Sequence, residues 1–106
     1  MSAINWFEIP VADMDRAMRF YEALLGRPLQ REVFMDVPHA IIKSSKDKDG
    51  VGGALIADPK RKPSGTGSCV YLDSSDIDAS FSIGPMGSIA LIKDTEGNLV
   101  GLHTEP

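Results

Sequence analysis

The first residues show the alternating pattern of a β-strand. Over Ile4–Val11, one side of a strand would carry Trp6 and Glu8, and the other side would carry Phe7 and Ile9. From Phe7 to Val11 the second side is apolar and suited to a core, with Asn5 before it, whereas the first side combines an aromatic ring with a carboxylate. We predict a strand here with two chemically different faces.

A helix is predicted directly after this strand. Asp13 can accept hydrogen bonds from the first turn, Gly26 is suited to ending the helix, and Pro28 prevents its continuation. The apolar positions between them recur at helical spacing and form one stripe: Met14, Ala17, Met18, Tyr21, Leu24 and Leu25. We expect this stripe to pack on the apolar side of the first strand.

Shorter strands follow. They are predicted at Leu29–Phe34, Ala40–Lys43, Gly52–Ala57, Cys69–Asp73, Ser88–Ile92 and Leu99–His103. Turns are expected at Pro38, at Lys46–Gly50 and at Asp94–Asn98, because these positions hold Pro, Gly, Asp and Asn. The Asp58–Gly67 stretch has no apolar period and is interpreted as a linker.

The chain also repeats itself. Asp13–Asp15 is echoed by Asp76–Asp78, 63 residues on, and Lys46–Gly50 is echoed by Lys93–Gly97, 47 residues on. Both echoes occur in the same order, which indicates two copies of a strand–helix–strands module. We predict an α+β domain over 1–106, with a first module at about 1–58, a linker at 59–67 and a second module at 68–106.

The second copy is shorter than the first. The two offsets differ by 16 residues, and a helix starting at Asp76 could not run through Gly84 and Pro85. Without that helix, Val70 and Leu72 would meet water at a cost of several kcal/mol, at about 25 cal/mol per Å². We therefore expect an interruption between residues 79 and 83, where residues of the molecule are left out; a truncated variant is the alternative.

Composition narrows the possible partners. The 106 residues carry a net charge of -4, which argues against nucleic acid or an anionic membrane as the main partner. No apolar stretch approaches the roughly 20 residues of a membrane helix, and no signal peptide is visible. Cys69 is the single cysteine, so no internal disulfide can form. We expect a cytoplasmic protein.

Two stretches resemble the vicinal oxygen chelate superfamily, which includes glyoxalase I, bleomycin-resistance proteins and extradiol dioxygenases. Asn5–Gly26 is similar to the family's opening strand and helix, and Ser88–His103 is similar to its closing hairpin. The resemblance implies two βαβββ modules that form a cup-shaped, half-open sheet around a cavity, usually completed in a dimer. We therefore expect a homodimer.

Metal-dependent members of that superfamily hold a divalent ion with four side chains. The resemblance places these positions at Trp6, Ala54, Cys69 and Gly101. Three of them offer no metal ligand, and a lone thiolate cannot hold an oxygen-preferring ion. We therefore expect no metal and no cofactor at the family's usual site.

Other groups could occupy the cup in place of the metal. The candidate site residues share one face of the two sheets, with Glu8 and His103 as acid and base and the rest as ligand-binding residues: Trp6, Glu8, Cys69, Tyr71, Gly101 and His103. Burial would raise the pKa of Glu8, and the Glu8–His103 pair could transfer protons or bind a polar ligand without reacting.

Each candidate also has a purely structural explanation. Glu8 and His103 would equally fit a buried hydrogen-bonded pair. Trp6 suits a core or a dimer interface, the hydroxyl of Tyr71 could bind the backbone, and Cys69 fits an inert apolar position. Outside this group, His39 is interpreted as a solvated loop residue, and Lys60–Lys62 as a solvated basic run with some capacity for an anionic ligand.

The leading hypothesis is a glyoxalase/bleomycin-resistance-like protein that binds a small organic molecule in the inter-module cup without a metal. The alternative is an enzyme: a lyase or isomerase that uses Glu8 and His103 as acid and base, possibly metal-assisted, or a dioxygenase-like member. A third hypothesis is a structural dimer whose cup is filled by side chains.

Overall fold

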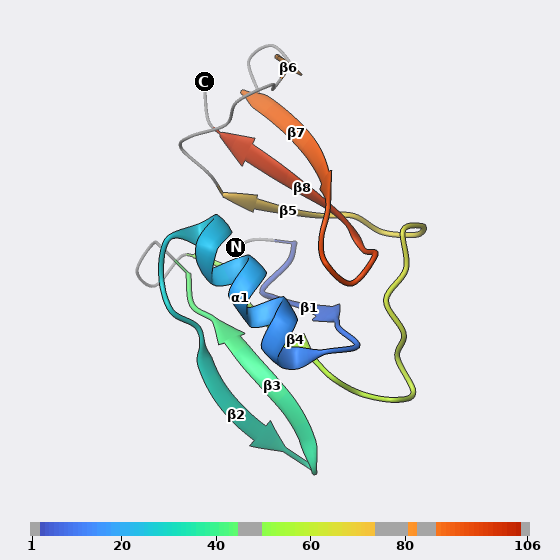
Figure 1. Ribbon diagram of the computed structural model, residues 1–106. Helices are drawn as coiled ribbons and strands as arrows, with labels where there is room; N and C mark the ends of the chain where they lie inside the picture. Colours follow the sequence, from blue (N-terminus) through green and yellow to red (C-terminus); the bar gives the residue numbers. More distant parts are fainter. Residues whose placement is uncertain (1–2, 45–49, 74–80, 83–86, 105–106) are drawn as a thin grey trace. The chain divides into compact units, whose positions relative to one another are not determined.

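The computed structural model describes residues 3–44, 50–73, 81–82 and 87–104, in two compact units (Figure 1). The first unit is Met1–Pro63 and the second unit is Ser64–Pro106. The first unit contains β1 (Trp6–Pro10), α1 (Met14–Leu25), β2 (Gln30–Phe34), β3 (Val37–Ile42) and β4 (Gly52–Ile56). The second unit contains β5 (Val70–Asp73), β6 (Phe81–Ser82), β7 (Ser88–Lys93) and β8 (Leu99–Thr104).

Each unit has its own open, four-stranded sheet. The strand orders are β1-β4-β3-β2 and β5-β8-β7-β6, so in both units the first strand pairs with the last. That pairing is parallel, and the remaining pairings are antiparallel. The predicted α+β class with two βαβββ-like modules is confirmed. In the described part of the second unit there are strands and no helix.

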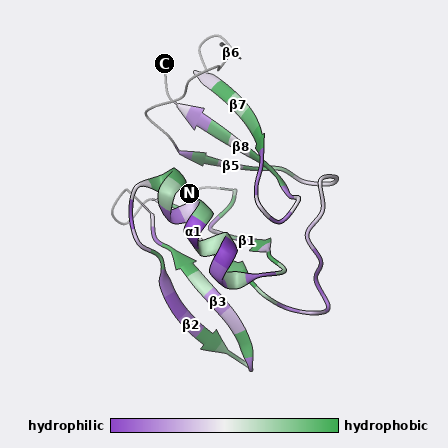
Figure 2. Cartoon of the chain, in the orientation of Figure 1, coloured by the Kyte–Doolittle hydropathy of each residue, from purple (hydrophilic) through white to green (hydrophobic). Residues whose placement is uncertain are grey.

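The predicted helix forms as expected. A side-chain oxygen of Asp13 accepts the backbone N–H of Arg16 at 3.0 Å, which caps the first turn. Gly26 adopts a left-handed φ of 70° and donates its N–H to the Glu22 carbonyl at 2.9 Å. α1 packs against β3 and β4. Its buried residues are Met14, Ala17 and Tyr21, and Figure 2 shows polar and apolar residues alternating around it.

The strand registers agree with the two offsets of the sequence repeat. Glu8 pairs with Ala54 in the first unit, and Tyr71 pairs with Gly101 in the second. Tyr71 lies 63 residues after Glu8, and Gly101 lies 47 residues after Ala54. The same relation holds one residue further along, where Ile9 pairs with Leu55 and Leu72 pairs with Leu102. The two units therefore repeat one ladder, position by position.

The turn predicted at Pro38 was wrong. Pro38 lies inside β3, and the chain reverses at Met35 and Asp36, which have φ angles of 51° and 64°. The usual pairs at such positions are Asn-Gly, Asp-Gly and Gly-Gly, so Met-Asp gave no clear turn signal. His39 consequently belongs to β3 and is half-buried, not a solvated loop residue.

The turn predicted at Asp94–Asn98 is present and rests on buried polar groups. One Asp94 carboxylate oxygen accepts the backbone N–H groups of Glu96 and Asn98 at 2.8 and 2.9 Å. The side-chain amide of Asn98 donates to the other oxygen at 2.9 Å. The side-chain oxygen of Asn98 accepts the backbone N–H of Ser64 at 2.9 Å, which fixes the start of the second unit to this turn.

Three expectations lie outside the described residues: the turn at Lys46–Gly50, the helix start at Asp76 and the interruption between residues 79 and 83. On β5, Leu72 is buried and Val70 is half-buried. Among the described residues, no helix is long and apolar enough to cross a membrane.

Candidate ligand-binding surface

One face of the first sheet carries the predicted site residues of the first unit. Cross-strand pairing aligns Glu8 with Ala54 and Ile41 in one row, and Pro10 with Ile56 and His39 in the next. These residues, together with Trp6, form what we call the helix-free face. Ile9 and Leu55 are buried on the opposite face, to which we assign α1 from its contacts with β3 and β4. Its centre, at Ala54 and Ile56, is buried. Its rim holds the polar and aromatic groups.

Trp6 is the exposed aromatic group of this rim. Its side chain is 47% exposed, and its ring lies next to Gly52, 3.7 Å from where a Cβ on that glycine would stand. Its indole N–H donates to a Glu8 carboxylate oxygen in a long hydrogen bond of 3.4 Å. Trp6 is thus a surface residue of the first unit, and its indole is hydrogen-bonded to the carboxylate beside it.

Glu8 is held by a cation from the linker. A terminal guanidinium nitrogen of Arg61 lies 2.7 Å from the second carboxylate oxygen of Glu8. The hydrogen bond from Arg61 is the main cause that lowers the pKa of Glu8, with a smaller contribution from the Trp6 indole, and together they outweigh the raising effect of burial. The expected rise of this pKa was therefore wrong, because a partner charge offsets the desolvation.

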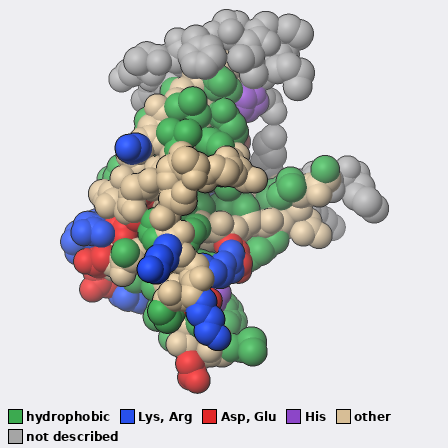
Figure 3. All heavy atoms as spheres, turned by 90° about the vertical axis from the view of Figure 1, so that its right-hand side faces the viewer, with side chains coloured by type: hydrophobic (Ala, Val, Ile, Leu, Met, Phe, Trp, Pro, Cys, Tyr) green, Lys and Arg blue, Asp and Glu red, His purple; other side chains and the backbone are tan. Residues whose placement is uncertain are grey.

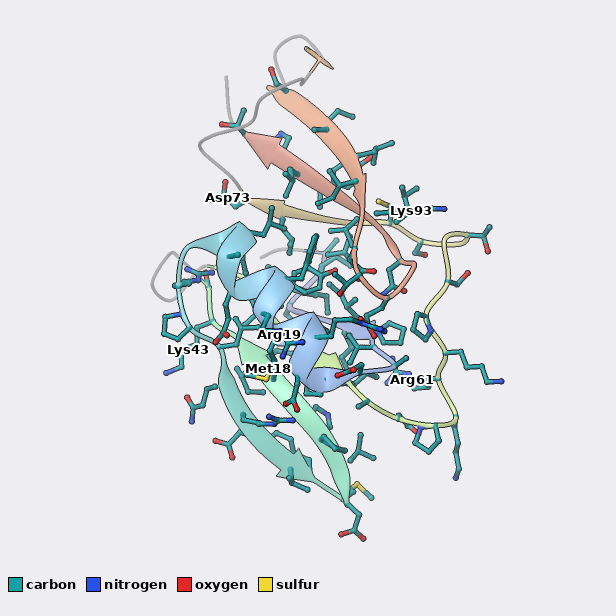
Figure 4. The ribbon with its side chains drawn as sticks, in the orientation of Figure 1. Met18, Arg19, Lys43, Arg61, Asp73 and Lys93 are labelled. Atoms are coloured by element: carbon teal, nitrogen blue, oxygen red, sulfur yellow. The ribbon has the colours of Figure 1, made fainter. Side chains whose placement is uncertain are left out.

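Arg61 is positioned by a local turn. The Asp58 carboxylate accepts the backbone N–H of Lys60 at 2.9 Å, and the Asp58 carbonyl accepts that of Arg61 at 2.9 Å. Figure 4 shows Arg61 extending from this segment toward β1. The basic run is therefore not simply solvated. Asp58 and Pro59 signal a turn in the sequence, but an ion pair between residues 53 positions apart has no sequence signature.

His39 is a further group on this face that the sequence did not single out. Its Nδ1 lies 2.8 Å from the Val37 carbonyl oxygen, so Nδ1 carries a proton and donates to that oxygen. Its ring packs edge-to-face against Phe34, with centroids 5.0 Å apart. His39 lies close enough to contribute a small further lowering of the Glu8 pKa. An alternation pattern running through Pro38 could have revealed it.

The equivalent face of the second unit has an apolar row next to a row that contains charged and polar groups. Gly101 on β8 pairs with Tyr71 on β5 and with Leu91 on β7, which makes one cross-strand row. Tyr71 and Leu91 are 45% and 47% exposed, and the ring of Tyr71 lies directly over Gly101. His103 pairs with Asp73 and Ile89 in the next row and is half-buried.

Cys69 precedes β5 and is half-buried. Its thiol donates weakly to the Leu99 carbonyl at 3.7 Å.

The predicted site residues are brought together within each unit. The structure places Trp6 and Glu8 side by side in the first unit, and Tyr71, Gly101 and His103 on neighbouring rows in the second. The convergence of Glu8 with His103 in one cup stays a prediction. Across the described ranges, no group of three or more His, Cys, Asp or Glu residues could hold a metal ion.

Comparison with known proteins points to one family. The family model "Glyoxalase/Bleomycin resistance protein/Dioxygenase superfamily" matches residues 3–82. No curated protein sequence matches the chain.

Among solved structures, TnmS3, an antibiotic binding protein from Streptomyces sp. CB03234, matches with a TM-score of 0.65 and 19% identity, covering 100% of this chain and 98% of that one. A glyoxalase/bleomycin resistance protein from the same organism matches with a TM-score of 0.65 and 20% identity, covering 92% and 96%. Lactoylglutathione lyase from Agrobacterium tumefaciens matches with a TM-score of 0.56 and 15% identity, covering 98% and 94%. The chain belongs to the glyoxalase/bleomycin resistance protein/dioxygenase superfamily.

Proposed function

We propose that this protein binds a small organic molecule with an aromatic part, and that it does so without a metal. The observation that carries the proposal is an exposed indole, Trp6, adjoining the Glu8–Arg61 ion pair on the helix-free face. Ligand sites combine apolar and aromatic surface with a few placed polar groups, and this surface has that composition.

The second unit supplies a second apolar surface at the equivalent ladder position. Tyr71 and Leu91 flank Gly101, whose missing side chain leaves room for the tyrosine ring over the strand. We propose Tyr71, Gly101, Cys69 and His103 as the ligand-binding groups of this unit. That one of the similar structures is an antibiotic binding protein supports this kind of function.

The enzymatic alternative receives less support from Glu8. Its lowered pKa keeps the carboxylate ionised at neutral pH, and each of its oxygens already accepts a hydrogen bond. A general acid at this position would need a proton, and a general base would need to leave Arg61. A lyase or isomerase would therefore depend on His103 for proton transfer.

The binding experiment can use the protein's own chromophore. Trp6 is the single tryptophan, so indole fluorescence reports on this surface alone. We expect saturable quenching or a spectral shift when planar aromatic compounds such as quinoline and flavone derivatives are titrated. Calorimetry should then show binding lost in Trp6→Leu and kept in Val33→Ala, which removes an exposed apolar side chain from β2. Absence of any response, with the protein folded, would leave the structural-dimer hypothesis in its place.

Metal independence has its own test. We expect calorimetric titration of Zn²⁺, Mn²⁺, Fe²⁺ or Ni²⁺ to show no stoichiometric tight site. One ion bound tightly per chain, and released in Glu8→Ala or His103→Ala, would contradict the metal-independent function and favour a metal-assisted enzyme.

We also propose a homodimer. β2 is an edge strand of the first sheet, and the hairpin it forms with β3 exposes Val33, Phe34 and Met35. Exposed apolar groups at a sheet edge are a common place for self-association. Light scattering at micromolar concentration should give twice the 11.4 kDa chain mass. A monomer under these conditions would refute the dimer.

A further inference from the structure

Glu8 and Arg61 differ in how many of their hydrogen-bonding groups are already occupied. Both oxygens of the Glu8 carboxylate accept, one from Arg61 at 2.7 Å and the other from the Trp6 indole at 3.4 Å. A guanidinium has five N–H donors in a planar fork. In the described part of the chain, Arg61 uses its side-chain donors on Glu8 alone. The carboxylate is therefore occupied, whereas the guanidinium still has donors to offer.

The surroundings of Arg61 are basic, although the chain as a whole is acidic. Lys60 and Lys62 flank it and are exposed, so this segment brings three cations, against the carboxylate of Asp58 in the same turn and that of Glu8 on β1. Figure 3 shows basic side chains gathered on this side of the molecule. The next carboxylate of the helix-free face, Glu32, is on β2, three strand spacings or about 14 Å from β1.

The aromatic and cationic groups lie within reach of one small molecule. Trp6 and Arg61 both donate to the same carboxylate, so the exposed indole and the guanidinium are neighbours across Glu8. The Asp58 turn fixes the backbone of Arg61, which reduces the ordering needed when a ligand binds.

We infer that Arg61 makes this surface selective for aromatic molecules that carry an anionic group, such as an aromatic carboxylate. This rests on the proposed function. The ring of the ligand packs on Trp6, and its anion accepts hydrogen bonds from the remaining donors of the guanidinium. Glu8 is a positioning residue: it orients Arg61 and does not contact the ligand.

A cationic ligand is disfavoured by the same contacts. To reach Glu8, it would have to displace Arg61, and the guanidinium would lose its partner and stay close to the incoming charge. An anionic ligand adds to the existing pair and leaves it intact. The geometry therefore distinguishes the two charges even though Glu8 and Arg61 together are neutral.

Three probes of the same shape test the charge preference: 2-naphthoate, 2-naphthamide and 2-naphthylmethylammonium. Binding is followed by the Trp6 indole N–H resonance in ¹H–¹⁵N spectra, which is unambiguous because the chain has one tryptophan. We expect 2-naphthoate to bind about five- to tenfold more tightly than the amide, and the ammonium compound to bind weakest.

Two variants assign the preference to a residue. Arg61→Gln should reduce the naphthoate-to-amide ratio to about one, whereas Lys62→Gln, which removes an equal charge from the same segment, should keep it within about twofold. Glu8→Gln should keep the sign of the preference. Unchanged amide and backbone resonances away from residue 61 would show that Arg61→Gln is folded.

The outcomes separate this inference from the proposed function. Equal binding of all three probes, or strongest binding of the ammonium compound, overturns the inference and leaves aromatic binding intact. Loss of the preference in Lys62→Gln as well overturns it too, because the cause would be the general charge of the segment. If none of the probes shifts the Trp6 resonance at millimolar concentration, the proposed function itself fails.

Discussion

The two units build the same ladder with different support. In both, the first and last strands pair in parallel with an equivalent register, Ile9 with Leu55 and Leu72 with Leu102. In the first unit α1 packs on the sheet beside Leu55, whereas the described part of the second unit contains no helix. Both registers agree with the alternation along the strands, which decides which side chains share a face.

The units also place their aromatic–glycine contacts on opposite faces. Phe7 covers Gly53 on the side where α1 packs, and Tyr71 covers Gly101 on the opposite side of its ladder. In the first unit, the missing side chain serves core packing. In the second, it lets an exposed ring lie on the face that we propose for ligand binding. A repeated ladder thus carries an aromatic–glycine contact in the core of one copy and on the proposed ligand-binding face of the other.

The largest effect should come from truncating the equivalent leucines. Leu55 is 0% exposed and Leu102 is 8% exposed. We expect Leu55→Ala to lower the free energy of unfolding by about 3–5 kcal/mol, because the helix and sheet around it cannot close the cavity. Leu102→Ala should cost about 2 kcal/mol, at the lower end of such substitutions. Urea denaturation followed by circular dichroism measures both.

An equal or larger loss in Leu102→Ala would contradict the contrast, and would mean that the second sheet is covered as completely as the first. A parallel measurement on Val33→Ala, an exposed position, supplies the baseline and should stay within about 0.5 kcal/mol of the parent.

Substituting the glycine of each aromatic–glycine contact should give a smaller difference in stability between the two units. A Cβ on Gly53 would meet the backbone carbonyl oxygen of Phe7 as well as its ring, with ring carbons at 2.6 Å, whereas a Cβ on Gly101 would meet the Tyr71 ring. Backbone cannot move aside, but a half-exposed ring can. We expect Gly53→Ala to cost about 1–3 kcal/mol and Gly101→Ala less than about 1 kcal/mol.

Double substitutions check the cause. Gly101→Ala combined with Tyr71→Ala should recover the small loss caused by Gly101→Ala, because the obstructing ring is gone. Gly53→Ala combined with Phe7→Ala should not recover, since the carbonyl oxygen remains. If both pairs behave alike in thermal unfolding, the distinction between backbone and ring is wrong.

Much of the fold could be predicted because it rests on local patterns. Asp13 and Gly26 bound a stripe at helical spacing, and the Asp94–Asn98 turn carries its own hydrogen-bond donors and acceptors. The turn at Met35 and Asp36 could not be predicted, since Met rarely adopts a positive φ and Asp36 is not followed by the glycine that marks such hairpin turns. Its position put His39 in a strand.

The site was predictable only where strand alternation decides it. Trp6 and Glu8 were expected on one side of a strand and do lie together. Arg61 was missed, because its partner is 53 residues away and no periodicity links a linker to a strand. That one contact also reversed the expected direction of the Glu8 pKa, which shows that a residue's burial alone does not fix its charge.

The smallest effect concerns the Glu8–Arg61 pair, whose side chains are 28% and 49% exposed. Since the pKa of Glu8 is lowered in the folded state, the pair stabilises the protein fully above the ordinary pKa of glutamate, and the contribution disappears as the pH falls through the lowered value. Solvent screening keeps it at about 0.2–1 kcal/mol.

Arg61→Gln should raise the pKa of Glu8, because burial still acts and the cation is gone. The pH titration of the Trp6 indole N–H resonance, which senses the carboxylate it donates to, should therefore shift to higher pH in Arg61→Gln and stay in place in Lys62→Gln. Identical midpoints in the parent and in Arg61→Gln would mean that the linker does not hold Glu8 in solution, and the first unit would then present a free carboxylate beside Trp6.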